Sequence, residues 1–266
     1  MVRRNRLDAE LVRRGLAPSR EQAASLIAAG RVRIAGGAAT KPATGVDPST
    51  PLVVRPAADG SPDYVSRGAH KLAAALAAFP VDPRGSRCLD AGASTGGFTD
   101  VLLRAGAAHV AAVDVGYGQL AWSLRADARV SVFDRTNVRH LEPDVIGGPA
   151  DLTVSDLSFI GLPVVLPALA RCTRVGGDLI VLVKPQFEVG KDNVGAGGVV
   201  RDPGLWASSI RTVAEQAGHL GLRARGLLPS PLPGPAGNIE FLLWLSAVGE
   251  AVDLETVIDA AIRDAP

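Results

Sequence analysis

The 266 residues, 47% of them hydrophobic, suffice for one domain of ordinary size and a second, small one. Cys88 and Cys172 cannot form a disulfide framework, and the basic N-terminus lacks the apolar run of a secretory signal. The best candidate for a membrane helix, residues 162–170, is too short and is interrupted by Pro163 and Pro167. We therefore expect a soluble, cytoplasmic protein without a membrane partner.

Charge is unevenly distributed along the chain, although the formal net charge is only +1. Residues 1–55 carry ten Lys and Arg against four Asp and Glu, whereas the remainder carries 18 against 23. A basic segment joined to a mildly acidic one indicates that the first part attracts phosphate groups. A basic face that only aids solubility is the alternative.

The first fifth of the chain has the pattern of a small module of helices and strands. An apolar stripe predicts a helix that ends near Gly15, and a capping signal at Ser19 predicts a second helix that ends at Gly30. Strands are expected at 32–34 and 52–54. The residues of this segment resemble the S4 RNA-binding domain, which implies binding of structured RNA through shape and phosphate contacts. They are Arg6-Leu7-Asp8, residues 19–23, Ile27, Gly30 and Arg31-Val32. A protein-binding role is the alternative. The predicted RNA-binding residues are Arg4, Arg6, Arg13, Arg14, Arg20, Arg31, Arg33, Lys41 and Arg67.

After a segment of linker composition at 56–64, strands alternate with helices. Strands are expected at 87–90, 110–113, 130–133, 152–154, 179–183, 222–228 and 239–245, with helices after Lys71, after Gly97, over 203–217 and from Asp253. This alternation predicts an α/β fold with a largely parallel, Rossmann-like sheet and helices on both faces. We place the small RNA-binding domain and its linker at 1–60 and the larger domain at 61–266.

A glycine-rich turn follows the first strand of the larger domain. The small residues from Ala91 to Gly97 allow a tight turn into a helix N-terminus, which suits a nucleotide-like cofactor. A turn needed only for packing is the alternative. Acidic residues close several of the apolar runs, and Asp114 is placed to accept hydrogen bonds from ribose hydroxyls. The predicted cofactor-binding residues are Asp90, Gly92, Ser94, Thr95, Gly96, Gly97, Phe98, Asp114, Asp134 and Asp156.

Two lysines and two carboxylates form a further candidate group: Lys71, Asp156, Lys184 and Glu240. Only four of the 28 basic residues are lysines, so a retained lysine is a candidate for a site where arginine cannot substitute. The four side chains can build an ion network on one rim of the sheet, able to orient and activate a hydroxyl nucleophile. Two ordinary salt bridges are the alternative.

Several motifs together resemble the TlyA family, in which an S4 domain precedes an FtsJ-like (RrmJ-like) methyltransferase domain. They lie at 66–71, 90–99, 114–120, 155–160, 184–188 and 237–240. The resemblance implies transfer of a methyl group from S-adenosylmethionine to a ribose 2′-hydroxyl of ribosomal RNA. It implies a catalytic set of Lys71, Asp156, Lys184 and Glu240. Our hypothesis is that Lys184, held by Asp156 and Glu240, helps to position or deprotonate the hydroxyl. The basic N-terminus and C-terminal helix resemble the longer members, which modify a cytidine in both subunits' RNA.

Three other functions share some of these features. A nucleotide-dependent oxidoreductase would use the same turn but leaves the lysines and the RNA-binding module without a role. An RNA-binding ribosome-assembly factor would leave the acidic strand ends without a role. Some family members are called haemolysins, but a membrane-active protein would need an apolar span or a cationic amphipathic helix. Because the sulfonium donor is its own electrophile, we expect no metal. No obligate protein partner is evident, so the expected partners are ribosomal RNA and ribosomal subunits.

Overall fold

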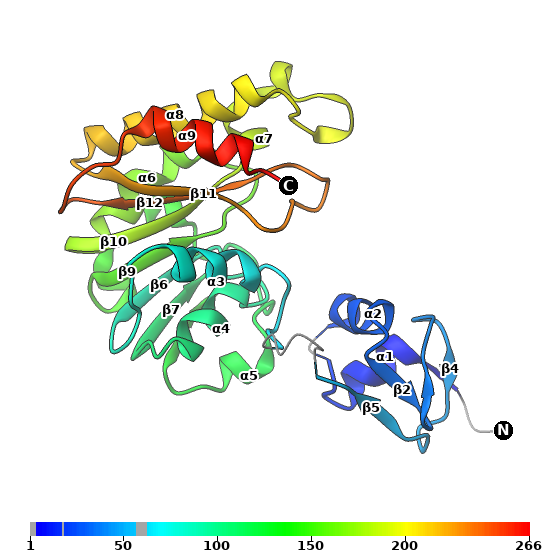
Figure 1. Ribbon diagram of the computed structural model, residues 1–266. Coiled ribbons are helices and arrows are strands. Elements are labelled where there is room, and N and C mark those ends of the chain that lie inside the picture. The colour runs from blue at the N-terminus through cyan, green and yellow to red at the C-terminus, as the bar shows by residue number, and fades with distance from the viewer. Residues whose placement is uncertain (1–3, 18, 57–62) are drawn as a thin grey trace. The chain divides into compact units, whose positions relative to one another are not determined.

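The computed structural model describes residues 4–17, 19–56 and 63–266 (Figure 1). Two units divide the chain, Met1–Arg67 and Gly68–Pro266. The domain boundary predicted at residue 60, and most of the predicted linker, lie outside the described residues. None of the helices within the described ranges has both the length and the apolar character needed to cross a membrane.

The smaller unit packs two helices beside short antiparallel strands. Its elements are β1 (Asn5–Arg6), α1 (Leu7–Arg13), α2 (Arg20–Ala28), β2 (Val32–Ile34), β3 (Gly37–Ala38), β4 (Gly45–Val46) and β5 (Leu52–Val54). The strands pair in the orders β3-β2-β5 and β1-β4. The Ser19 hydroxyl accepts a hydrogen bond from the Gln22 backbone N–H at 3.1 Å, so α2 begins at the predicted cap. Leu7, Leu11 and Ile27 are buried between the helices and strands.

The larger unit is built on one sheet. Its elements are α3 (Ala69–Ala78), β6 (Arg87–Ala91), α4 (Gly97–Arg104), β7 (His109–Val113), α5 (Trp122–Arg125), β8 (Val130–Phe133), β9 (Ala150–Ser155), α6 (Leu162–Arg171), β10 (Thr173–Val183), α7 (Pro185–Glu188), α8 (Pro203–His219), β11 (Arg223–Pro229), β12 (Phe241–Ser246) and α9 (Leu254–Arg263). Short 3-10 helices lie at Val138–His140, Pro143–Ile146, Lys191–Asn193 and Ala196–Gly198.

The seven strands follow the order β11-β12-β10-β9-β6-β7-β8. The five from β10 to β8 are parallel, whereas β12 is antiparallel to both of its neighbours. Helices α6, α8 and α9 cover one face, and α3 and α4 cover the other (Figure 1). The predicted α/β fold with a largely parallel sheet and helices on both faces is confirmed.

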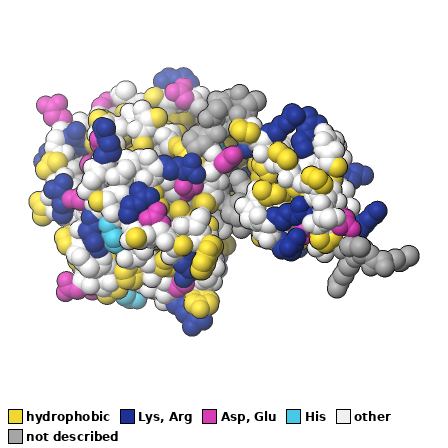
Figure 2. All heavy atoms as spheres, turned by 90° about the horizontal axis from the view of Figure 1, so that it is seen from below, with side chains coloured by type: hydrophobic (Ala, Val, Ile, Leu, Met, Phe, Trp, Pro, Cys, Tyr) yellow, Lys and Arg dark blue, Asp and Glu magenta, His cyan; other side chains and the backbone are white. Residues whose placement is uncertain are grey.

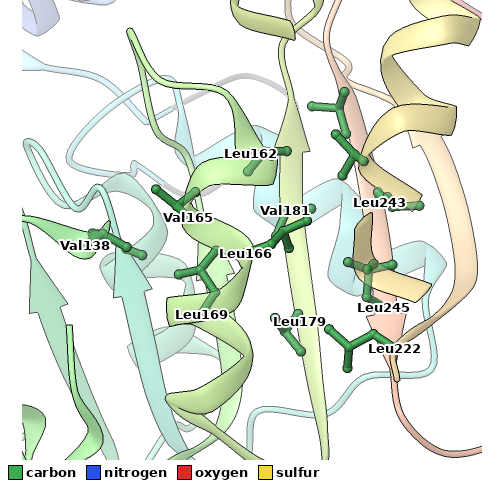
Figure 3. Close-up of a cluster of buried hydrophobic side chains, with 14 of the residues drawn as sticks. Val138, Leu162, Val165, Leu166, Leu169, Leu179, Val181, Leu222, Leu243 and Leu245 are labelled. Atoms are coloured by element: carbon green, nitrogen blue, oxygen red, sulfur yellow. The ribbon is translucent and has the colours of Figure 1, made fainter. Parts of the chain in front are cut away.

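Helix α6 was not among the predicted elements, because two prolines interrupt its apolar run. Pro163 lies in the first turn, where its missing N–H would have no helical partner, and Pro167 lies inside the helix. The helix forms nevertheless because its apolar side buries Leu166 and Leu169 against β10 and its neighbours (Figure 3). Packing here outweighs the hydrogen bond that Pro167 cannot make.

The antiparallel direction of β12 brings its first residues to the edge where the parallel strands end. Val183, the last residue of β10, pairs with Phe241, the first residue of β12. Lys184 directly follows β10, and Glu240 directly precedes β12. Both residues therefore lie at the same edge of the sheet. A wholly parallel sheet would have placed Glu240 at the opposite edge.

Candidate active site

The turn after β6 approaches the segment after β9 closely at Gly92. Gly92 has φ of +93°, and a Cβ there would lie 2.6 Å from the Asp156 carbonyl oxygen, so only glycine fits. Gly96 also has a positive φ, of +97°, but a Cβ there would overlap the Leu124 side chain of α5. Gly92 thus shapes the crevice between β6 and β9, whereas Gly96 serves the packing of α5.

Asp114 ties the turn to the end of β7. One of its carboxylate oxygens accepts a hydrogen bond from the Ser94 backbone N–H at 2.8 Å, and the other accepts one from the Gly116 N–H at 2.6 Å. These two bonds fix the carboxylate while each oxygen keeps a further lone pair. Asp114 can therefore accept hydrogen bonds from a ligand's hydroxyls.

A cavity of about 440 Å³ opens at this edge of the sheet. That volume is in the range of small-molecule and cofactor sites. Of the predicted cofactor-binding residues, Gly92, Ser94, Asp114 and Asp156 line it. Its other lining residues are Val115, Gln119, Thr136, Asn137, Val138, Leu157, Ser158, Phe159, Ile160 and Val165. Most of these lie in loops after strand ends, where no periodicity marks them in the sequence.

The predicted cofactor-binding residues Thr95, Gly96, Gly97 and Phe98 do not line this cavity. Thr95 accepts a backbone hydrogen bond from Ala121, and the other three are buried at or near the start of α4. Their side of the turn faces the protein, so their placement indicates a role in shaping the turn.

Asp134, directly after β8, does not line the cavity either. It accepts hydrogen bonds from the Arg125 guanidinium at 2.9 Å and from the Gly118 N–H at 3.3 Å. The Arg125 hydrogen bond lowers the pKa of Asp134 below its ordinary value. Thr136 and Asn137 line the cavity in its place.

Asp90 is fully buried beneath the turn. One of its oxygens accepts a hydrogen bond from the Thr99 hydroxyl at 2.6 Å, and the other has no partner among the described residues. Burial raises the pKa of Asp90 to about 7, against the lowering effect of the Thr99 hydrogen bond. Asp90 does not line the cavity, so its second oxygen is a buried polar atom whose partner the described residues do not supply.

The four charged residues predicted as a network form two ion pairs. Lys71 Nζ lies 2.5 Å from Glu240 Oε2, and Lys184 Nζ lies 2.5 Å from Asp156 Oδ1. Lys71, Lys184 and Glu240 are at most 7% exposed, so pairing is what makes these charges tolerable inside the protein. Within the described residues, no hydrogen bond or ion pair joins Lys184 to Glu240.

Two neutral side chains extend these pairs. Lys184 also donates to the Ser158 hydroxyl at 3.0 Å, and Gln186 donates to Glu240 Oε1 at 3.4 Å. Sequence reasoning did not identify either residue, although both lie inside motifs that carry the family resemblance. Asp156 belongs to both parts of the site, because it lines the cavity and holds Lys184.

The basic residues of the smaller unit fall into different groups. The Arg14 guanidinium donates to Glu10 and to the backbone oxygens of residues 47, 48 and 50. Arg31 donates to the Arg55 carbonyl and pairs with Asp63. These two side chains are 20% and 16% exposed and stabilise the module itself. Arg33 is partly buried. The other predicted RNA-binding residues are exposed, namely Arg4, Arg6, Arg13, Arg20, Lys41 and Arg67. Figure 2 shows dark-blue basic side chains on the visible face of this unit.

The fold and this site define a class of protein. A parallel sheet with a glycine turn, an acidic second strand end and a cofactor-sized crevice is the arrangement of a Rossmann-like methyltransferase domain. Residues 64–247 match the FtsJ-like methyltransferase family, and residues 5–51 match the S4 domain. The chain belongs to the TlyA family of FtsJ-like methyltransferases.

Several relatives match most or all of the chain. The 16S/23S rRNA (cytidine-2′-O)-methyltransferase TlyA of Mycobacterium tuberculosis is 58% identical over 270 residues, covering 100% of both chains. Hemolysin A of Brachyspira hyodysenteriae is 34% identical, over 89% of this chain and 98% of the relative. A solved structure of a hemolysin-named protein from Streptococcus thermophilus is 38% identical, with a TM-score of 0.76 over 99% of this chain and 98% of the other.

Proposed function

We propose that this protein transfers a methyl group from S-adenosylmethionine to the ribose 2′-hydroxyl of a cytidine in ribosomal RNA, in both the small and the large subunit. The relative from M. tuberculosis, whose name states this reaction on 16S and 23S RNA, supports the choice of acceptor. One observation carries the proposal: Asp156 lines the cofactor-sized cavity and holds Lys184 at 2.5 Å. Donor pocket and catalytic lysine therefore share one residue.

The residues of the cavity fit S-adenosylmethionine. The Gly92 turn lets a ligand approach the backbone, Asp114 accepts from ribose hydroxyls, and Asn137 offers an amide to an adenine edge. When bound, the cofactor supplies an electrophilic methyl group on its sulfonium sulfur.

Lys184 acts on the acceptor hydroxyl in this proposal. Its amine is fixed by Asp156 and Ser158, so it can orient the 2′-oxygen, and once it has passed one of its own protons to Asp156 or to solvent it can take the proton that this oxygen loses. Glu240 acts through Lys71, to which it is paired, and completes the charged rim on the β12 side. Of the two carboxylates that the sequence suggested, Asp156 is the one that pairs with Lys184 among the described residues.

The smaller unit supplies the RNA contacts. Its exposed arginines suit phosphate contacts, which position an RNA without reading its sequence. Ribosomal RNA, free or within a subunit, is then the partner, and the reaction takes place where ribosomes are assembled, in the cytoplasm.

Labelled methyl transfer tests the proposal. Purified protein is incubated with methyl-labelled S-adenosylmethionine and, separately, with isolated small subunits, large subunits and the naked RNA of each. We expect label in RNA from both subunits and its loss in Lys184→Ala, while calorimetric binding of S-adenosylmethionine persists. Transfer to neither RNA, or binding of NAD in place of S-adenosylmethionine, would overturn it.

A further inference from the structure

A buried carboxylate lies beneath two exposed arginines of the smaller unit. Asp8, at the start of α1, is 4% exposed, yet it accepts hydrogen bonds from Arg6 at 3.1 and 3.0 Å and from Arg20 at 3.3 and 2.9 Å. Its Oδ1 also accepts the Ala9 backbone N–H at 2.8 Å. One carboxylate thus joins β1, α1 and the first residue of α2.

The two guanidinium groups lie side by side because they share one oxygen. Arg6 Nη2 and Arg20 Nη2 are both within 3.0 Å of Asp8 Oδ2. Their side chains remain 52% and 59% exposed, and neither guanidinium has another hydrogen-bond partner among the described residues. Their remaining N–H groups are therefore available to a ligand outside the protein.

We propose that Asp8 is a positioning residue for RNA, which holds Arg6 and Arg20 together as one fork for a backbone phosphate. This inference rests on the RNA binding that the proposed function requires. Two like charges would otherwise move apart, and each free arginine side chain would lose rotamer freedom on binding. Held by Asp8, the pair presents planar donors in a fixed geometry, which suits a phosphate.

Asp8 remains negatively charged at neutral pH. The hydrogen bond from Arg6, with that from Arg20, lowers the pKa of Asp8 to about 2 despite its burial. A second buried carboxylate, Glu10, holds Arg13 in a similar way but also anchors Arg14 to the core of the module. Asp8 is therefore the cleaner position for a test.

This proposal predicts an effect on RNA affinity opposite to the one expected from net charge alone. Asp8→Asn removes a negative charge from a surface that binds a polyanion, so a uniform charge effect would strengthen RNA binding. Positioning predicts the reverse, because the amide is uncharged and its single oxygen cannot accept all the hydrogen bonds that the two carboxylate oxygens receive from Arg6, Arg20 and the Ala9 N–H. We expect affinity for RNA to fall about tenfold.

The experiment measures binding of a labelled small-subunit RNA transcript by the full-length protein at fixed salt. Asp47→Asn is the matched control, since Asp47 lies in the same unit but, within the described part of the chain, its side chain accepts hydrogen bonds from Ser49 and from no arginine. We expect binding by the control to be unchanged or slightly tighter. In an Arg6→Ala/Arg20→Ala background, Asp8→Asn should cause no further loss.

Two results overturn the inference. One is Asp8→Asn binding as tightly as wild type or more tightly. The other is that Asp8→Asn lowers RNA affinity as much in the Arg6→Ala/Arg20→Ala background as in the wild type, which would indicate general damage to the module. Methyl transfer by the wild type to the same RNA is measured in parallel, so that failure of the catalytic proposal is seen separately from failure of this one.

Discussion

Lys184 and Glu240 follow and precede neighbouring strands, yet they belong to different ion pairs. Removing Glu240 leaves the buried charge of Lys71 unpaired, whereas removing Lys184 leaves Asp156 unpaired, whose side chain is 24% exposed and lines the cavity. We predict that Glu240→Gln slows methyl transfer by about a hundredfold with unchanged S-adenosylmethionine affinity, a size typical of lost acid–base or orienting groups. Asp156→Asn should lower both the rate of methyl transfer and the affinity for S-adenosylmethionine.

Single-turnover rates and calorimetric affinities, with Lys191→Ala as a control for an exposed lysine, distinguish these outcomes. Full activity in Glu240→Gln would remove Glu240 from the catalytic set.

Gly234 offers a test of how tightly Glu240 must be held. A Cβ at this position would lie 2.5 Å from Glu240 Oε1, so the absence of a side chain leaves room for the carboxylate. We predict that Gly234→Ala displaces Glu240 and slows methyl transfer at least tenfold, since small misplacements at a reacting centre are costly. Gly218→Ala, in α8 with no atom within 4 Å of the added carbon, should leave the rate unchanged. Equal rates for the two variants would contradict the account.

At the scale of elements, Glu188 joins α7 to α6. Helix α6 begins without a side-chain cap of its own, and the Leu162 N–H donates instead to Glu188 Oε1 at 2.9 Å. This bond lies between the segment that carries Lys184 and the loop that carries Asp156. Burial raises the pKa of Glu188 from 4.5 to about 7, so the folded state holds its proton more tightly than the unfolded state.

The stability contributed by this group is therefore complete below pH 4.5 and is lost as the pH rises to about 7. We predict that from pH 5 to pH 7 the wild type loses on the order of 2 kcal/mol more unfolding free energy than Glu188→Gln, whose amide oxygen can still accept from Leu162. Denaturant unfolding followed by tryptophan fluorescence reports this, because all three tryptophans lie in the larger unit. Parallel pH profiles would show that Glu188 does not titrate there.

Local signals made some elements predictable and left others hidden. The cap at Ser19 and the apolar runs ending in acidic residues were readable because each rests on neighbours in the chain. Helix α6 was not, because its prolines are outweighed by packing against a sheet distant in sequence. The partners of Glu240 were hidden for a related reason, since they depend on the direction of β12. Loop residues such as Asn137 carry no periodic signal at all.

At the scale of the whole molecule, the charge division along the chain corresponds to two units with different tasks. The smaller unit carries net positive charge and the larger one carries the cavity and the buried ion pairs. We predict that RNA affinity of the full chain falls steeply with added salt, because phosphate contacts release counterions, whereas S-adenosylmethionine affinity changes little. Binding titrations of both ligands from low to physiological salt check this. A shallow salt dependence for RNA would contradict a phosphate-based interface.

The identity of the methylated atom tests the central claim most directly. Ribosomal RNA treated with the protein and labelled S-adenosylmethionine is digested to nucleosides, which are separated and identified by mass spectrometry. The account predicts that the label is recovered in 2′-O-methylcytidine and is absent when Lys184→Ala replaces the wild type. Label in a base-methylated nucleoside, or undiminished 2′-O-methylcytidine with the variant, would contradict it.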